Sequence, residues 1–502
     1  MKKLNYATLA ETGYDGYILK DAPEKVIQFG EGNFMRAFVD YWFDLMNEKA
    51  GFNGKVVLVQ PIAPGLAKMI NEQEGLYTLF LRGFENGQKV NAKRVISSVS
   101  RCLNPYEDYQ AVLDCAKNPD LRFISCNTTE AGIAYDPECK FEDVPASSYP
   151  GKLTQFLYER FKHFGKEKGK GFIILSCELI DNNGKELEKC VLQYVDQWNL
   201  GEEFKTWVKE ENTFCSTLVD RIVTGYPRNE AAQICEELGY EDNLIDTGEV
   251  FGFWVIEGPQ SIKKELPVEE AGLPILICDD HKPYKQRKVR ILNGAHTSMV
   301  LGAYLAGQDI VRDCMHDEVI CGFMNKTIYD EIIPTLTLPE EELKEFAAAV
   351  TERFNNPFVD HALLAISLNS TSKWKARVMP SLKGYVEKYG KVPACIAASL
   401  AFYIEFYRGT KLEDGHFTGV RNAAGKNNEY EIKDDLPILK FYDAHKNDSA
   451  DVLAKEVLSN TDFWGEDLTA VPGLLDAVTE AMKLSETEGT YAVMQKCLKA
   501  AE

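Results

Sequence analysis

The sequence predicts an α/β protein: a Rossmann-like, doubly wound amino-terminal domain followed by a mainly α-helical carboxyl-terminal domain. Three observations support this prediction. The 502 residues exceed what a single ordinary core accommodates. Short apolar runs alternate with amphipathic stretches in the first half, whereas helical periodicity continues almost to the end of the second half. The change of pattern around the turn DDHKPYKQ predicts two domains, residues 1–280 and 281–502.

The first half contains the alternation of strands and helices that a parallel sheet requires. Strands are expected at the apolar runs 25–29, 55–59, 122–125 and 172–176. Helices are expected at residues 33–45, 105–117, 152–164 and 185–198. In the second half, long helices are expected at 340–354, 394–407 and 474–483, and the polar residues 409–434 are expected to form a surface loop or excursion.

Composition limits the partners and the compartment. The net charge of -21 argues against nucleic acid and anionic membranes, which basic surfaces bind. No apolar stretch is long enough to span a membrane, and the amino terminus lacks the apolar core of a signal peptide. The 13 cysteines include no C-x-x-C pair, which favours reduced thiols. We therefore expect a cytoplasmic monomer or small homo-oligomer that binds a small molecule.

Metal-ligand spacing is absent from the histidines and cysteines. The cluster Cys278-Asp279-Asp280-His281 has the right residue types for a metal site. A solvated turn leading into Pro283 explains the same residues better. We expect no metal ion in the reaction.

The segment QFGEGNFMRA places Gly30 and Gly32 between a strand and a helix. This layout lets backbone N–H groups approach a pyrophosphate at a helix N-terminus. Met35 replaces the third glycine of the usual fingerprint, so an ordinary glycine turn fits the residues equally well. Arg36 can contact a phosphate or form a surface salt bridge. Gln60, after the second strand, can bond a ribose hydroxyl, and no adjacent cation attracts a 2′-phosphate, so the residues favour NAD.

Three polar side chains, Lys288, Asn293 and His296, precede an apolar stretch. On an α-helix of about 100° per residue they spread over roughly 140°. A half-buried lysine suits general acid–base catalysis, and an asparagine with a histidine can stabilise a developing oxyanion. The spacing alone favours the other interpretation, a solvated lysine, a capping asparagine and a core histidine.

Four motifs in the same order resemble the mannitol dehydrogenase (long-chain polyol dehydrogenase) family. They are GEGNFMRA at 30–37, SCNTTEAG at 125–132, LVDRIV at 218–223, and the set Lys288, Asn293 and His296. The resemblance runs from about residue 25 to near residue 490. The longer segments STLVDRIVTGYP and KPYKQRKVRILNGAHT are most similar to members that reduce keto-hexuronates to aldonates.

The resemblance implies zinc-independent hydride transfer with NAD. It implies that Lys288 is the general acid/base, that Asn293 and His296 hold the reacting oxygen, and that Asp220 and Lys373 contact substrate. Arg377, one helical turn beyond Lys373, is a candidate for the substrate carboxylate, although a surface position fits it equally well. The expected cofactor contacts are Phe29, Gly30, Gly32, Asn33, Phe34, Arg36, Gln60, Thr128 and Glu130.

Three departures from the polyol-oxidising members bear on specificity. Cys177-Glu178-Leu179 replaces a Cys-Asp-Asn motif, Ala365 replaces an arginine, and Lys285 stands where some members have a glutamate. The first two disfavour a neutral polyol dehydrogenase, and the third leaves the proton path open. An epimerase that retains NAD and a nucleotide-sensing protein without activity are the remaining alternatives.

Overall fold

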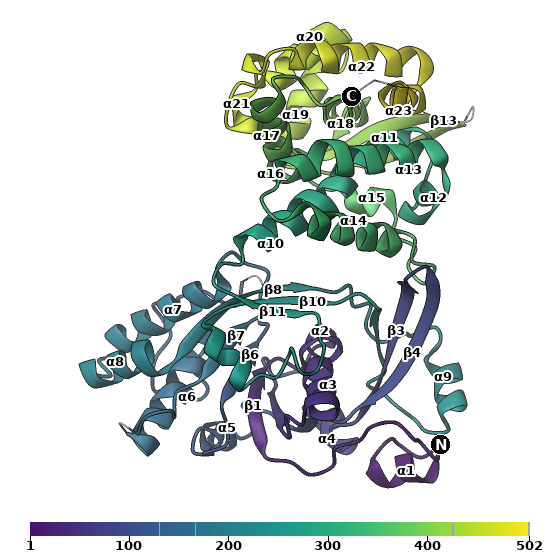
Figure 1. Ribbon diagram of the computed structural model, residues 1–502. Helices are drawn as coiled ribbons and strands as arrows, with labels where there is room; N and C mark the ends of the chain where they lie inside the picture. Colours follow the sequence, from purple (N-terminus) through teal and green to yellow (C-terminus); the bar gives the residue numbers. More distant parts are fainter. Residues whose placement is uncertain (130, 166, 424–425, 500–502) are drawn as a thin grey trace. The chain divides into compact units, whose positions relative to one another are not determined.

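The structure is a computed structural model that describes residues 1–129, 131–165, 167–423 and 426–499. The chain forms two compact units, Met1–His281 and Lys282–Glu502 (Figure 1). Across the described ranges, no helix is both long and apolar enough to cross a membrane.

The first unit is built on an eight-stranded sheet. Its strands, in spatial order, are β11 (Ile275–Cys278), β10 (Phe253–Glu257), β8 (Thr213–Asp220), β7 (Ile173–Ser176), β6 (Phe123–Cys126), β1 (Glu24–Phe29), β2 (Lys55–Val59) and β5 (Val99–Leu103). All neighbours are parallel except β8 and β10. The strand order reverses between β1 and β6, so their carboxyl ends open a crevice where Rossmann-like folds bind ligands.

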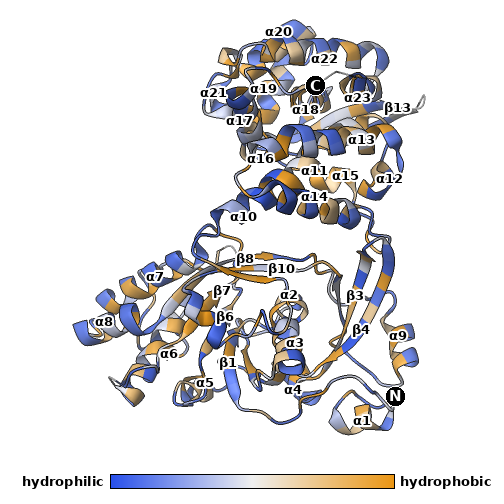
Figure 2. Cartoon of the chain, viewed as in Figure 1, coloured by the Kyte–Doolittle hydropathy of each residue, from blue (hydrophilic) through white to orange (hydrophobic). Residues whose placement is uncertain are grey.

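Helices cover both faces of this sheet (Figure 1). One face packs against α2 (Asn33–Ala37), α3 (Val39–Ala50) and α4 (Ala67–Glu72). The other packs against α5 (Tyr109–Cys115), α6 (Tyr149–Phe164), α7 (Asn183–Gln197) and α8 (Glu202–Glu211). Figure 2 shows β8 and β10 largely orange, while α7 and α8 alternate blue and orange as helices with one solvated face do. The predicted doubly wound fold is confirmed.

A second sheet was not predicted. It orders β4 (Gln88–Ile96), β3 (Tyr77–Glu85) and β9 (Asp246–Glu249), with α1 (Tyr6–Glu11) and α9 (Ala231–Leu238) as the remaining helices of the unit. Strands β3 and β4 form a hairpin whose two turn residues, Asn86 and Gly87, have φ of 52° and 74°. An Asn-Gly pair between strand-like segments is a strong hairpin signal, so the sequence did contain this information.

The second unit is mainly helical, as predicted. Its helices are α10 (Lys282–Arg287), a π-helix (Lys288–Asn293), α11 (Gly294–Leu305), α12 (Val311–His316), α13 (Glu318–Lys326), a second π-helix (Thr327–Ile332), α14 (Glu340–Phe354), α15 (Leu363–Ile366), α16 (Ser370–Arg377), α17 (Met379–Tyr389), α18 (Ala394–Phe406), α19 (Leu436–His445), α20 (Ala450–Leu458), α21 (Thr461–Trp464), α22 (Leu474–Glu488) and α23 (Thr490–Lys499). Helices α11 and α18 are buried along almost their whole length and form its centre.

The prediction of a surface loop at residues 409–434 is wrong. These residues contain β12 (Lys411–Glu413), β13 (His416–Ala423) and β14 (Lys426–Ile432), paired antiparallel. Asp414 and Gly415, with φ of 49° and 82°, make the tight turn between the first two strands. Buried Phe417 and Ile432 pack one face inward, so burial on that face overrides the polar composition of the segment.

Buried carboxyl groups predict how stability depends on pH. Burial raises the pKa of Asp40 to about 8 and that of Glu178, Asp246 and Glu331 to about 7. These values exceed those of an unfolded chain, so the folded protein binds the protons more tightly. The stabilisation is complete below about pH 4 and is lost as the pH rises through 7 to 8. We expect the thermal unfolding midpoint to fall by at least about 5 °C between about pH 5 and pH 8.

Asp40→Asn supplies the control. The variant removes the group with the highest of these pKa values and should flatten the decline with pH. A midpoint that rises between about pH 5 and pH 8 would contradict the assignment of these protons.

Candidate active site

The loop after β1 leaves room for a ligand where the sheet crevice opens. Gly30 has a φ of 124°, and a Cβ at this position would lie 3.2 Å from the carbonyl oxygen of Asn127. Gly32 precedes α2 in an extended conformation, and a Cβ there would meet nothing within 4 Å. Gly30 therefore permits the close approach of two loops, whereas Gly32 leaves open space before the first turn of α2. These features fit the pyrophosphate of a dinucleotide.

A buried amide fixes this loop. The Nε2 of Gln28 donates to the carbonyl oxygen of Gly30 at 3.0 Å and to Asp40 at 3.2 Å. Its Oε1 accepts a hydrogen bond from the Ser125 hydroxyl at 3.0 Å. Gln28 thus joins β1 to α3 and β6, and the loop is held in place without a ligand.

Arg36 does not face the predicted phosphate site. Its guanidinium is 2% exposed and donates to the carbonyl oxygens of Glu31 and Leu244 and to the side chain of Asn33. Buried Asp246 lies 4.0 Å away. The prediction of a phosphate contact is therefore not supported, because a buried guanidinium needs these acceptors.

Three further predicted nucleotide contacts have side chains that are engaged within the protein. The Gln60 amide donates to the carbonyl oxygens of Ile62 and Ala63, and its oxygen accepts from the Ala67 N–H, so it shapes its own loop. The Phe29 ring lies in the core, leaving only its backbone at the crevice. Phe34 stacks on Phe38 with ring centroids 5.1 Å apart.

The loop after β6 forms the opposite side of the crevice. Thr128 is half-buried, and both its N–H and its hydroxyl donate to Oε1 of Glu178, at 3.0 and 3.1 Å. The predicted contact Glu130 lies outside the described residues.

A cavity of about 870 Å³ lies beyond the carboxyl ends of β2 and β5. Its lining includes Gln60, Pro64, Lys68, Glu72, Glu107 and Asp108. Lys68 supplies a cation to this cavity, although no basic residue is adjacent to Gln60 in the sequence. Three acids share the cavity with it, and Glu72 lies 4.0 Å from its ammonium. The local charge is therefore unfavourable for an additional phosphate.

In the second unit, Lys288 and Asn293 lie on a different helix type from the one expected, whereas His296 lies on an α-helix. Lys288–Asn293 is a π-helix, and α11 begins at Gly294, whose N–H donates to the Val289 carbonyl oxygen five residues earlier. Residues five apart therefore lie about one turn apart, so Lys288 and Asn293 approach a common face more closely than on an α-helix. The predicted wide fan on an α-helix is wrong, and the true geometry groups the polar residues more tightly.

His296 lies in an aromatic and cationic environment. Its ring stacks on Phe354, with centroids 3.9 Å apart, and meets the edge of His361 at 5.6 Å. Burial lowers the pKa of His296 well below 6.5, and the neighbouring basic residues His361, Arg353 and Arg377 lower it further. The ring is therefore neutral at pH 7. No residue in the described ranges bonds its Nε2, which leaves this atom for a ligand.

The two predicted substrate cations of α16 differ in their contacts. The Lys373 ammonium donates to the Ile366 carbonyl oxygen at 2.8 Å, and burial together with Arg377 lowers its pKa. Half-buried Arg377, whose pKa burial lowers, has neither a hydrogen bond nor an ion pair from its guanidinium to any described residue. Its carbonyl oxygen lies 3.3 Å from the Cβ position of Gly294, which places the end of α16 against the start of α11.

The remaining predicted substrate contact, Asp220, lies on another element, as do two of the positions that differ from the polyol-oxidising members. Buried Asp220 ends β8 in the first unit. Leu179 is 64% exposed just after β7, and Ala365 lies on α15. Sequence inspection missed Phe354 and His361, because nothing in the local pattern of α14 or the following segment indicates that they meet His296.

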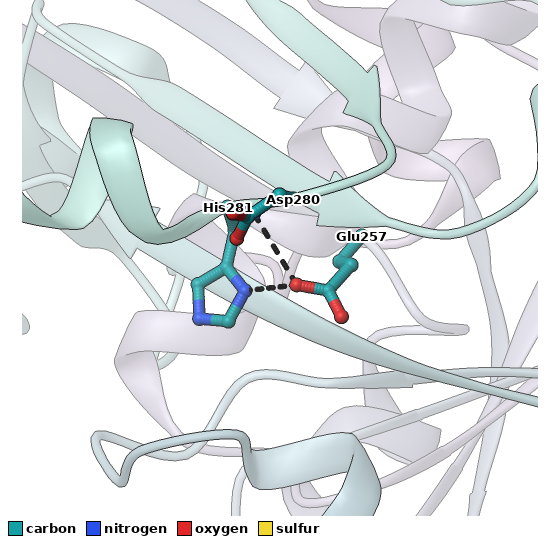
Figure 3. A group of neighbouring side chains, drawn as sticks. All are labelled: Glu257, Asp280 and His281. Atoms are coloured by element: carbon teal, nitrogen blue, oxygen red, sulfur yellow. Dashed lines mark hydrogen bonds and ion pairs between the residues drawn. The ribbon is translucent and has the colours of Figure 1, made fainter. Parts of the chain in front are cut away.

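The candidate metal cluster is an ion-paired group (Figure 3). Glu257, Asp280 and His281 offer ligand atoms within 4.8 Å of one another. Oε1 of Glu257 accepts from Lys185 at 2.6 Å, and Oε2 lies 2.5 Å from the ring of His281. Burial raises the pKa of Glu257, but these hydrogen bonds outweigh it and lower the pKa to about 2. The carboxylate is thus committed to protein partners.

Two family models match the chain in tandem. The mannitol dehydrogenase Rossmann domain matches residues 24–270, and the mannitol dehydrogenase C-terminal domain matches residues 280–485. The chain belongs to the mannitol dehydrogenase family. The resemblance inferred from the four sequence motifs is confirmed.

Curated relatives of this family member span nearly the whole chain. The altronate oxidoreductase of Bacteroides thetaiotaomicron is 48% identical over 476 residues, covering 95% of this chain and 97% of the relative. The altronate oxidoreductase of an Escherichia coli O7:K1 strain is 48% identical over 463 residues, covering 91% and 93%.

Two solved structures share the family fold. Substrate-free D-sorbitol dehydrogenase has a TM-score of 0.79 at 22% identity and covers 98% of this chain and 100% of its own. Pseudomonas fluorescens mannitol 2-dehydrogenase, a ternary complex with NAD and D-mannitol, has a TM-score of 0.65 at 21% identity and covers 99% and 100%. At these identities the likeness concerns fold alone.

We expect this family member to need no metal, because the Glu257 carboxylate is already bonded to Lys185 and His281. Exhaustive dialysis against a chelator should leave both the thermal unfolding midpoint and the catalytic rate unchanged. Activity that falls and returns only with zinc or another divalent ion would contradict this expectation.

Proposed function

We propose that the chain is an NAD-dependent oxidoreductase that interconverts tagaturonate and altronate. The observation that carries the proposal is the placement of Lys288 and Asn293 on one π-helix directly before neutral His296, with the end of α16 at Arg377 packed against the start of α11. The Arg377 guanidinium makes no hydrogen bond or ion pair with the described residues. Identity of 48% to altronate oxidoreductases over 95% of the chain supports the same substrate pair.

Nucleotide binding is assigned to the unit Met1–His281. Its glycine loop fits a pyrophosphate, with Gly30 and Gly32 keeping side chains out of the approach. The acids Glu72, Glu107 and Asp108 around the cavity after β2 disfavour a 2′-phosphate and support NAD over NADP.

Catalysis is assigned to the unit Lys282–Glu502. NADH, when bound, would supply the hydride that the ketone carbon accepts. The Lys288 ammonium gives a proton to the carbonyl oxygen, which becomes the hydroxyl, and solvent returns a proton to the amine. The Asn293 amide donates a hydrogen bond to the same oxygen as negative charge develops. His296 offers a ring nitrogen to the same oxygen. Because the ring is neutral, it does not repel the protonated lysine.

Arg377 explains a preference for an acid over a neutral sugar. A protein with a net charge of -21 repels anions at long range, so a carboxylate requires a local cation. A half-buried guanidinium without a protein partner can bind a carboxylate through two parallel hydrogen bonds. Asp220 in the first unit and Lys373 in the second are each proposed to contact the substrate.

Lys288→Ala should lower the rate of turnover by roughly two to four orders of magnitude, because the general acid is lost. Binding of NADH, measured by fluorescence titration, should be unchanged. A variant that retains more than about a tenth of the wild-type rate would exclude this role.

Arg377→Met should raise the KM for tagaturonate by about ten- to a hundredfold, as expected for loss of a charged hydrogen-bonded contact. The unmodified enzyme should prefer tagaturonate over fructose by at least about a hundredfold in kcat/KM, and the variant should narrow that gap. Lys375→Ala, on the same helix, is the matched control and should leave both values unchanged.

Comparable efficiencies for fructose and tagaturonate in the unmodified enzyme would overturn the substrate assignment. Equal losses for both sugars in Arg377→Met would show that Arg377 supports the fold and does not recognise the carboxylate.

A further inference from the structure

A buried carboxylate, Glu178, lies behind the loop that follows β6. The residue is 2% exposed and lies two positions after the end of β7. Its Oε1 accepts the N–H and the hydroxyl of Thr128, and its Oε2 accepts the thiol of Cys126 at 3.6 Å. The three groups that donate to the Glu178 carboxylate are all neutral, and no described cation pairs with it. Burying a carboxylate beside neutral donors alone costs free energy. A role in positioning those donors would account for keeping the carboxylate there.

The loop that Glu178 holds is pressed against the glycine loop. The N–H of Asn127 donates to the carbonyl oxygen of Phe29 at 3.3 Å, and the Asn127 carbonyl oxygen faces Gly30. Thr129 has a φ of 73°, a conformation that non-glycine residues adopt only when their surroundings enforce it. A displacement of Thr128 would therefore move the wall of the crevice opposite the glycines.

We propose that Glu178 is a positioning residue for the nicotinamide nucleotide, acting through Thr128 to fix the crevice wall opposite Gly30. The inference rests on the proposed function, because it takes NAD to bind in this crevice. Glu178 itself does not contact the reacting atoms in this scheme.

Ionisation of Glu178 gives the proposal a distinctive signature. Burial raises its pKa to about 7, although hydrogen bonds from its own backbone, Thr128 and Cys126 act in the opposite direction. The other titratable groups beside it are Cys126 on β6, Cys177 after β7 and Tyr149 on α6. Burial raises the pKa of all three, so they remain neutral near pH 7.

A carboxylate accepts stronger hydrogen bonds than a neutral carboxylic acid does. Thr128 is therefore held more firmly above pH 7 than below it. The affinity for NADH should weaken as the pH falls through 7, and this dependence should disappear when Glu178 no longer titrates.

The test is a fluorescence titration with NADH between about pH 6 and pH 8.5, on the full chain. Glu178→Gln should bind NADH about tenfold more weakly than wild type at high pH, and its Kd should be nearly independent of pH. Wild type should lose about three- to tenfold in affinity between high and low pH.

Glu331→Gln is a matched control. Glu331 is also buried, accepts the N–H groups of Cys395 and Ile396 at 2.8 Å, and has its pKa raised to about 7 by burial. It lies in the other unit, so the variant should retain the wild-type Kd for NADH and its pH dependence. A purely structural effect of losing a buried carboxylate would appear in both variants.

Cys126→Ser keeps the proposal testable if Glu178→Gln does not fold. A hydroxyl is a stronger donor than a thiol, so it should lower the pKa of Glu178 and move the midpoint of the NADH pH dependence to lower pH. An unmoved midpoint, or wild-type binding by Glu178→Gln, would overturn the inference alone. Failure of the unmodified protein to bind NADH at any pH would overturn the proposed function as well.

Discussion

The close approach of two loops at the crevice of the first unit is the constraint on which the nucleotide site depends. A Cβ on Gly30 would lie 3.2 Å from the Asn127 carbonyl oxygen, so the loops after β1 and β6 can meet only where a glycine stands. Gln28 and Glu178, both buried, then hold the two loops from below. The strands of the sheet thus anchor a few buried, hydrogen-bonded polar groups, and these groups in turn hold the loops at the crevice.

The second unit holds several polar side chains in half-buried positions around the start of α11. The π-helix Lys288–Asn293 widens the turn that carries the lysine and the asparagine. Phe354 covers one face of His296, and burial together with the neighbouring basic groups lowers the pKa of the ring, which keeps it neutral. In the proposed reaction, each unit therefore supplies one part of the chemistry with groups that are already oriented.

The strand and helix pattern revealed the doubly wound sheet and the helical second half because apolar burial fixes both periodicities. The segments that escaped, β3 with β4 and β12 to β14, are hairpins whose signal is a two-residue turn, Asn86-Gly87 or Asp414-Gly415, and not a long periodic run. Among site residues, the glycines follow from local geometry alone. The contacts of Arg36 and Gln60 cannot be predicted in this way. Arg36 donates to the Leu244 carbonyl oxygen, which is distant in sequence, and Gln60 donates to the Ile62 carbonyl oxygen, which depends on how its own loop folds. His361 beside His296 is likewise a product of tertiary packing.

The guanidinium of Arg377, without a partner in the described part of the chain and close to the start of α11, has a practical consequence. A half-buried cation without a counter-ion attracts whatever small oxyanion the solution offers. Phosphate, sulfate and citrate from the buffer would then occupy the position proposed for the substrate carboxylate and act as competitive inhibitors. Kinetic constants measured in such buffers would describe the competition as much as the enzyme, whereas chloride-based, zwitterionic buffers would leave the position open.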